Sequence, residues 1–136
     1  MILIDTSVLI NYFKGVNSPK TKKFEEILET GTPFGINNFI YQEVLQGASS
    51  EKEFNRLIGY LSSQKFYELR YGTRSYENAA KMYYICRKKG ITPRSTIDLL
   101  IVETAIENNL FLLHDDKDYT EIASVVEDLK EDRYTI

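Results

Sequence analysis

Short apolar runs alternate along the chain with longer segments in which apolar residues recur every three or four positions. The short runs predict buried strands, because the strands of a parallel sheet are covered on both faces. The longer segments have the period of amphipathic helices. The predicted strands are ILI at residues 2–4, PFGI at 33–36, KFYEL at 65–69, LFLL at 110–113 and ASVV at 123–126.

Residues that favour helix ends bound the predicted helices between these strands. The pair Ser18-Pro19 is typical of a helix start, and Gly90 is typical of the residue that follows a helix. The predicted helices span residues 6–13, 20–29, about 38–46, 50–61, 73–89, 96–108 and 116–122. Strands that alternate with helices favour an α/β fold with a mostly parallel sheet and right-handed crossovers.

Two carboxylates directly follow predicted strands. Asp5 ends the segment ILID, and Asp116 follows LFLLHD. The carboxyl ends of parallel strands meet at one edge of a sheet, where open α/β proteins bind their ligands. Both residues also have an ordinary interpretation, because Asp is a common helix N-cap and DDKD is typical of a solvated turn.

Two further carboxylates lie on predicted helices beside apolar positions. Glu43 stands within IYQEVL. Asp98 shares a helical face with Ile101, Val102 and Ala105, which follow it at helical spacing. The ordinary alternatives are an amphipathic-helix residue for Glu43 and a favourable first-turn acid for Asp98.

Taken together, the four carboxylates predict a cation site. Two like charges 4 Å apart repel by about 4 kcal/mol at an effective dielectric constant of 20. A buried group of such charges needs either a cation or a shifted protonation state. A site made only of oxygen ligands suits Mg²⁺ or Mn²⁺.

Composition narrows the class of protein. A chain of 136 residues with 43% hydrophobic and 27% charged residues predicts one globular domain with a substantial core. Cys86 is the only cysteine, which excludes an intramolecular disulfide. The sequence has neither an apolar run of membrane-spanning length nor a basic leader, so we expect a cytoplasmic protein without a membrane association. The net charge of -3 argues against a general nucleic-acid-binding surface.

Four segments of the chain resemble the PIN-domain ribonucleases, and more narrowly the VapC-type toxins of toxin–antitoxin pairs. They are IDTSVLI, YQEVLQG, TIDLLIVETAIENNLFLL and HDDKDY, which follow the family's order from one end of the chain to the other. The resemblance implies a single PIN-like domain over residues 1–136. Its expected fold is a three-layer α/β/α sandwich around a mostly parallel sheet of four to five short strands.

The resemblance also implies a metal-dependent endoribonuclease that uses Mg²⁺ or Mn²⁺. The implied catalytic and metal-binding residues are Asp5, Glu43, Asp98 and Asp116. The auxiliary candidates are Thr6, Ser7 and Asp118. Thr6 and Ser7 can contact a metal-bound water or a phosphate, and helix capping is their ordinary alternative.

The tail HDDKDY departs from the family's pattern at one position. Relatives often have a Thr or Ser where this chain has His114. The departure leaves open whether a hydroxyl helps to hold a metal-bound water, and whether Asp115 or Asp116 is the fourth acid, although the register favours Asp116. His114 is the only histidine, which excludes a metal-free ribonuclease with a catalytic histidine pair.

Basic residues and amphipathic helices suggest where partners bind. The residues Arg87, Lys88, Lys89 and Arg94 precede the helix of Asp98 and can contact RNA phosphates. A solvated helix end is the alternative for these residues. The resemblance implies a groove near residues 20–30 and 50–62 that takes a cognate antitoxin, and a toxin that forms a homodimer and blocks translation.

Two rival functions are open to an α/β domain with these acids. One is a catalytically idle PIN-like module that binds RNA or protein. The other is a Mg²⁺-dependent phosphoacceptor signalling domain, which usually has paired acids after its first strand and a Lys after a late strand. This chain has one acid after ILI and no Lys at the end of a late apolar strand. The sequence therefore favours the nuclease.

Overall fold

The sheet of the computed structural model, which describes residues 1–131, has five parallel strands. These are β1 (Ile2–Ile4), β2 (Phe34–Ile36), β3 (Lys65–Phe66), β4 (Phe111–Leu113) and β5 (Lys130–Glu131). Their spatial order is β3-β2-β1-β4-β5. The chain therefore builds outward from β1 in one direction and then returns to build in the other, which makes β1 and β4 the topological switch point.

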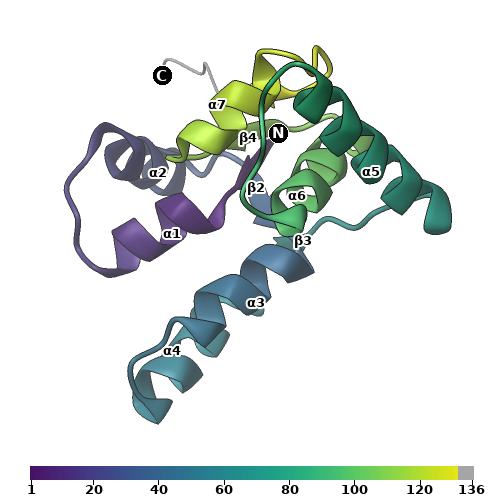
Figure 1. Cartoon of the computed structure of the whole chain (residues 1–136). Helices are drawn as coiled ribbons and strands as arrows, with labels where there is room; N and C mark the ends of the chain where they lie inside the picture. The colour runs from purple at the N-terminus through teal and green to yellow at the C-terminus, as the bar shows by residue number, and fades with distance from the viewer. Residues whose placement is uncertain (132–136) are drawn as a thin grey trace.

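Helices cover both faces of the sheet. They are α1 (Thr6–Phe13), α2 (Pro19–Thr30), α3 (Asn38–Gln46), α4 (Glu51–Leu61), α5 (Thr73–Lys88), α6 (Thr96–Glu107) and α7 (Lys117–Ala123). Figure 1 shows α1 and α2 on one side of the sheet and α5 and α6 on the other, while α3 and α4 extend away from it. The predicted α/β sandwich with a parallel sheet is confirmed. No helix within residues 1–131 is long and apolar enough to cross a membrane.

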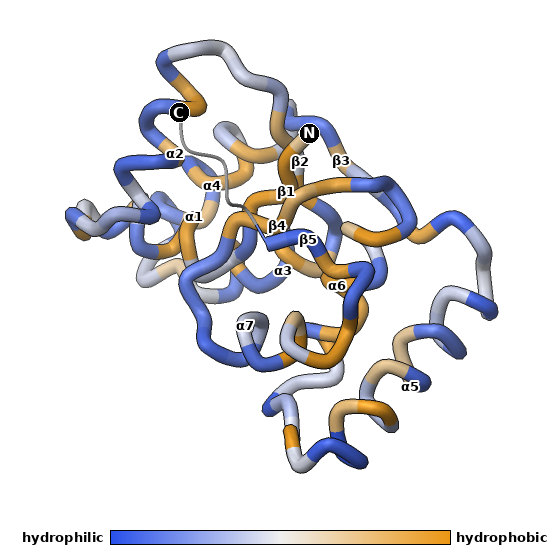
Figure 2. The backbone as a smooth tube through the Cα atoms, turned by 90° about the horizontal axis from the view of Figure 1, so that it is seen from above, coloured by the Kyte–Doolittle hydropathy of each residue, from blue (hydrophilic) through white to orange (hydrophobic). Residues whose placement is uncertain are grey.

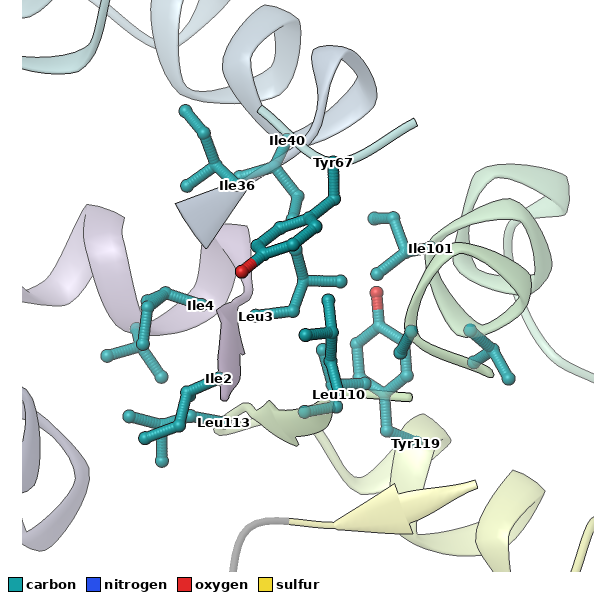
Figure 3. Close-up of a cluster of buried hydrophobic side chains, with 14 of the residues drawn as sticks. Ile2, Leu3, Ile4, Ile36, Ile40, Tyr67, Ile101, Leu110, Leu113 and Tyr119 are labelled. Atoms are coloured by element: carbon teal, nitrogen blue, oxygen red, sulfur yellow. The ribbon is translucent and has the colours of Figure 1, made fainter. Parts of the chain in front are cut away.

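The central strands form the middle of the hydrophobic core. All three residues of β1 are buried, and Figure 3 shows them among apolar side chains that include Ile40 of α3 and Ile101 of α6. Gly35 in β2 permits a close approach, because a Cβ there would lie 2.5 Å from the Tyr67 ring and 2.6 Å from the Lys65 carbonyl oxygen. Burial of these strands fixes the edge of the sheet at which the polar residues that follow them lie.

Side-chain caps start the helices where the sequence predicts. Ser18 forms a reciprocal capping box with Thr21, and Asn37 accepts a hydrogen bond from the backbone of Ile40. Asp5 and Asp116 are N-caps of α1 and α7, which confirms the capping alternative for Asp5. The solvated-turn alternative for DDKD is wrong for Asp118, whose side chain is buried. Capping and a functional role are compatible, since a cap uses one oxygen of a carboxylate.

Four strand predictions need correction, and one of them is PFGI, whose strand begins at Phe34. ASVV is not a strand, because Ala123 ends α7 and the last described strand is β5. The strand predicted over residues 65–69 is only Lys65–Phe66, and LFLL pairs from Phe111 onward. Strands β3 and β5 lie at the two edges of the sheet, and Figure 2 shows β5 as hydrophilic. Neither strand therefore has a strongly apolar sequence.

Candidate active site

Asp5 is buried at the switch point, directly after β1. Asp5 is 3% exposed, and its backbone N–H donates to the Leu113 carbonyl at the end of β4. Oδ2 accepts hydrogen bonds from the backbone N–H of Ser7 at 2.9 Å and from the Ser7 hydroxyl at 2.6 Å. Oδ1 accepts from the Tyr119 hydroxyl at 2.9 Å. Donors on both oxygens fix the orientation of this carboxylate.

The Tyr119 hydroxyl connects Asp5 to Asp98. It lies 2.9 Å from Asp5 Oδ1 and 3.3 Å from Asp98 Oδ1. Burial and the charges of these acids raise the pKa of Tyr119 well above its usual range, so the hydroxyl keeps its proton and remains a donor. Tyr119 was not among the predicted site residues. The available signal was the aromatic residue that ends HDDKDY.

Asp98 lies in the first turn of α6 and faces other acids. Its pKa is raised to about 7, because burial disfavours its charged form and the charges of Asp5 and Asp116 repel it. The hydrogen bond from Tyr119 opposes this shift only in part. A carboxylate in this position gains from a nearby cation.

Glu43 reaches the same edge of the sheet from α3. The Thr6 hydroxyl donates to Glu43 Oε1 at 2.8 Å. Burial raises the pKa of Glu43, the Thr6 hydrogen bond lowers it, and the charge of Asp5 raises it further. Thr6, predicted as an auxiliary residue, therefore contacts one of the four acids directly.

Asp116 and Asp118 complete the acidic group from α7 and the residue before it. One carboxylate oxygen from each of Asp98, Asp116 and Asp118 lies within 4.8 Å of the others. The backbone N–H of Asp118 donates to Asp116 Oδ1 at 2.9 Å. Arg94 approaches both acids, with Nε 2.9 Å from Asp118 Oδ2 and Nη2 3.3 Å from Asp116 Oδ1.

Arg94 decides the charge state of Asp118. Burial alone would raise the pKa of Asp118, but the hydrogen bonds and positive charge of Arg94 hold it below its usual value. Asp118 thus remains ionised although its side chain is buried. The charge of Arg94 also interacts with Asp98, but less strongly than with Asp118, and the pKa of Asp98 stays raised.

The acidic group fits a divalent metal ion of the Mg²⁺ type. Its ligand atoms are carboxylate oxygens, which such hard cations prefer. They come from the ends of β1 and β4 and from the adjoining helices α3 and α6. A site of this composition at the switch point of an α/β sheet is suited to bind phosphate esters through the ion.

Comparison with known proteins identifies the family. The sequence pattern of the PIN domain matches residues 2–125. The chain is 30% identical over 129 residues to Ribonuclease VapC11 of Mycobacterium tuberculosis, and that alignment covers 92% of this chain and 93% of the relative. The chain belongs to the PIN-domain family. VapC ribonuclease Mb1587 of Mycobacterium bovis matches this PIN domain with the same identity and coverage.

Solved structures share the fold of this PIN domain at low sequence identity. A chain of VapBC2 from Rickettsia felis, bound to a DNA fragment from its promoter, superposes with a TM-score of 0.74 at 15% identity and covers 99% of this chain and all of that one. A toxin–antitoxin complex from Klebsiella pneumoniae gives a TM-score of 0.61 at 23% identity, over 96% of this chain and 99% of that one.

The turn after β4 distinguishes Asp116 from Asp115 in this PIN domain. Asp115 is exposed, and its backbone N–H donates to the Ser7 hydroxyl at 2.9 Å. The backbone N–H of Asp116 donates to His114 Nδ1 at 3.2 Å, which leaves Nε2 of His114 to donate to Glu131 Oε2 at 2.8 Å. Buried His114 therefore supports the turn, and the geometry favours Asp116 as the fourth acid.

The predicted basic residues of the PIN domain separate into two places. Arg94 lies at the acidic site. Arg87 and Lys88 lie at the end of α5, over the rings of Tyr83 at 5.9 Å and Tyr84 at 5.3 Å. The remaining candidate, Lys89, is the C-cap of α5. Among the described residues, no ion pair joins these three cations to the acids.

A separate apolar cavity of about 890 Å³ lies between α1, α2 and α4. Its lining includes Tyr12, Phe13, Leu28, Leu57 and Tyr60. Leu28 and Tyr60 are 43% and 57% exposed, which is unusual for large hydrophobic side chains that share a concave surface. None of the four acids lines this cavity.

Proposed function

We propose that this PIN domain is a metal-dependent endoribonuclease that hydrolyses RNA phosphodiester bonds as the toxin of a toxin–antitoxin pair. The observation that carries the proposal is the convergence of Asp5, Glu43, Asp98 and Asp116 at one sheet edge, with the Tyr119 hydroxyl between Asp5 and Asp98. The VapC ribonucleases to which the chain is similar support the substrate class.

Asp5, Asp98 and Asp116 are the proposed metal ligands, with Mg²⁺ or Mn²⁺ as the ion. The bound ion would supply a lowered pKa for water and neutralise charge on the phosphate and the leaving oxygen. The fixed hydrogen bonds of Asp5 orient one ligand before any ion binds. The raised pKa of Asp98 indicates the place where a positive charge relieves the most repulsion.

Glu43 has a different proposed role. It is held by Thr6 at 2.8 Å on the side of the site that α3 forms. From there it can orient the attacking water and accept its proton, since burial raises its pKa above the usual value. Binding of a second ion is the alternative role for this residue.

The cavity between α1, α2 and α4 is the proposed antitoxin groove. Its exposed apolar residues, Leu28 and Tyr60, suit the apolar face of a partner segment. The toxin–antitoxin complex and VapBC structures that share the fold support a protein partner. An Arg or Lys of the antitoxin could then pair with the acids and displace the ion. Co-purification with a small protein encoded beside this one tests this partner, and its failure in the native host would count against it.

We also propose that the protein acts in the cytoplasm as a homodimer and blocks translation by cutting RNA. The family likeness supports these three statements. Light scattering of the purified chain tests the oligomeric state, and a monomer at all concentrations would contradict the dimer.

Cleavage of a total-RNA pool by antitoxin-free protein tests the activity. Reactions with Mg²⁺, Mn²⁺ or EDTA are compared, with Asp98→Asn as the variant. We expect discrete fragments that require a metal and are absent with the variant. Folded wild-type protein that cuts nothing with either metal would favour the catalytically idle alternative. Cleavage that persists in Asp98→Asn would indicate a contaminating nuclease.

A further inference from the structure

Arg94 lies just before α6, and its side chain reaches the first turn of α7. Its Nε donates to Asp118 Oδ2 at 2.9 Å, and its backbone N–H donates to the same oxygen at 3.3 Å. Its Nη2 donates to Asp116 Oδ1 at 3.3 Å. These contacts fix the guanidinium at the edge of the acidic site.

The two partners differ sharply in exposure. The side chain of Asp118 is 6% exposed, whereas that of Arg94 is 70% exposed. A buried acid therefore holds a cation that is open to solvent. The hydrogen bonds use Nε and Nη2, and the donors on Nη1 have no partner within residues 1–131.

RNA cleavage at this site requires a phosphate to approach several carboxylates. Like charges repel, so a fixed cation beside the acids favours that approach. Among the described residues, Arg94 is the only Lys or Arg that forms ion pairs with these acids. The planar guanidinium fork matches phosphate oxygens in geometry as well as in charge.

Asp118 is poorly placed to serve as a metal ligand. Its Oδ2 already accepts two N–H groups from Arg94, and the Arg94 charge lies beside it. A second cation on the same carboxylate would meet that charge at short range. Asp118 is better suited to orient Arg94.

We propose that the Arg94 guanidinium binds the RNA phosphate at which the acids act, and that Asp118 holds Arg94 in place and does not bind the metal. The inference rests on the proposed ribonuclease function and names a residue that contacts its substrate.

The test compares Arg94→Ala, Arg94→Lys and Asp118→Asn with a charge-matched control, Arg74→Ala, which changes an exposed arginine at the start of α5. The substrate is a fluorophore–quencher RNA that spans a cleavage site mapped in total RNA. Steady-state kinetics give kcat and KM, and calorimetry gives the Kd for Mn²⁺. Thermal unfolding reports the stability of each variant.

We expect Arg94→Ala to lower kcat/KM by about 10- to 100-fold, the effect of one charge-assisted hydrogen-bonding group. Mn²⁺ should bind equally well or more tightly, because a competing cation is gone. Arg94→Lys should recover only part of the activity, since it keeps the charge without the fork. Asp118→Asn should lower kcat/KM by about 3- to 10-fold with an unchanged Kd for Mn²⁺, and Arg74→Ala should match wild type.

Three outcomes would overturn the inference. Equal cleavage by Arg94→Ala and wild type would show that Arg94 does not contribute a phosphate contact. A loss of Mn²⁺ affinity in Arg94→Ala that parallels its loss of cleavage would reduce Arg94 to a support for Asp116. Weaker Mn²⁺ binding by Asp118→Asn would make Asp118 a ligand. In each case wild type still cuts RNA, which separates these results from failure of the proposed function.

Discussion

Helix α6 carries two groups of acids with opposite chemical settings. Asp98 lies at the start of the helix, and Glu103 lies more than one turn further along. The pKa of each is raised to about 7. Asp98 faces Asp5 and Asp116, which come from the ends of two strands. Buried Glu103 packs toward α5, where Asn78 donates to it at 3.2 Å, and it shares a hydrogen bond with Glu107.

The difference lies in what can relieve the repulsion. Below about pH 7 the Glu103 carboxyl holds a proton that Glu107 can accept, because burial and the hydrogen bond to Glu107 raise its pKa. Glu107 Oε1 accepts the backbone N–H of Arg70 at 2.6 Å. Among the described residues, Glu107 Oε2 is buried and has no other hydrogen-bond partner, so a proton on Glu103 relieves this pair inside the fold. The Asp98 group gathers acids at the switch point, beside an exposed cation, where a ligand can enter. A raised pKa therefore indicates a functional site only when topology also leads a ligand to it.

Removal of each carboxyl charge gives the largest expected contrast. Asp98→Asn should lower RNA cleavage by about 1,000-fold, because loss of a metal ligand removes several kcal/mol of transition-state stabilisation. Glu103→Gln should leave cleavage within about twofold of wild type, since its neighbours do not contact the site. Initial rates on mapped RNA measure both. Equal losses in the two variants would erase the distinction between the groups.

Metal binding should separate the groups by thermal stability. Mg²⁺ at about 100 times its Kd should stabilise the wild type by about 2.7 kcal/mol. Glu103→Gln should keep this gain and Asp98→Asn should lose it. Calorimetric unfolding with Mg²⁺ or EDTA makes the measurement. A Mg²⁺ effect that disappears in Glu103→Gln would indicate that the ion binds near Glu103 and not at Asp98.

The pH dependence of stability should contain one contribution from each group. Unfolded Asp and Glu lose their protons near pH 4, whereas native Asp98 and Glu103 hold theirs until about pH 7. The native state thus binds more protons, so the metal-free unfolding free energy should fall as pH rises from about 4 to 8. We expect about 1–2 kcal/mol from each after solvent screening.

Denaturant titrations across this pH range can assign the two contributions. Saturating Mg²⁺ should remove the Asp98 contribution alone, and Glu103→Gln should remove the other. A stability that rises over this range would contradict both raised pKa values.

The smallest expected effect concerns the Tyr119 hydroxyl. Tyr119→Phe keeps the ring, which packs 5.1 Å from the His114 ring, and removes the donor to Asp5. The metal-free unfolding free energy should fall by about 1.5 kcal/mol, because a buried carboxylate oxygen loses its hydrogen bond. Urea denaturation with EDTA measures this change, and an unchanged stability would mean that water replaces the hydroxyl.

Much of the fold follows from local signals in the sequence. Apolar runs located β1, β2 and β4, and capping residues such as Ser18 and Asn37 located helix starts. The polar strand β5 could not be found in this way, because Lys130 and Glu131 make a strand only through pairing with β4. Its stability is tertiary in origin.

The candidate site likewise contains residues that local sequence patterns predict and residues that only the fold brings together. Asp5 and Asp116 follow strands, so strand prediction alone placed them at one sheet edge. The approach of Glu43 from α3 depends on helix packing that no short pattern encodes. The pair of Arg94 with Asp118 and the bridge made by Tyr119 required the fold, since each joins segments that are distant in sequence.

The bond from Tyr119 to Asp5 spans 114 positions of the chain. Synthesis proceeds from the N-terminus, so Asp5 is available long before its partner exists. Asp98, Asp116 and Arg94 also arrive late. A growing chain consequently carries Asp5 and Glu43 before Asp98, Asp116 and Arg94 have been made. The acidic site can therefore assemble only after the segment that carries Asp116 and Tyr119 has been made.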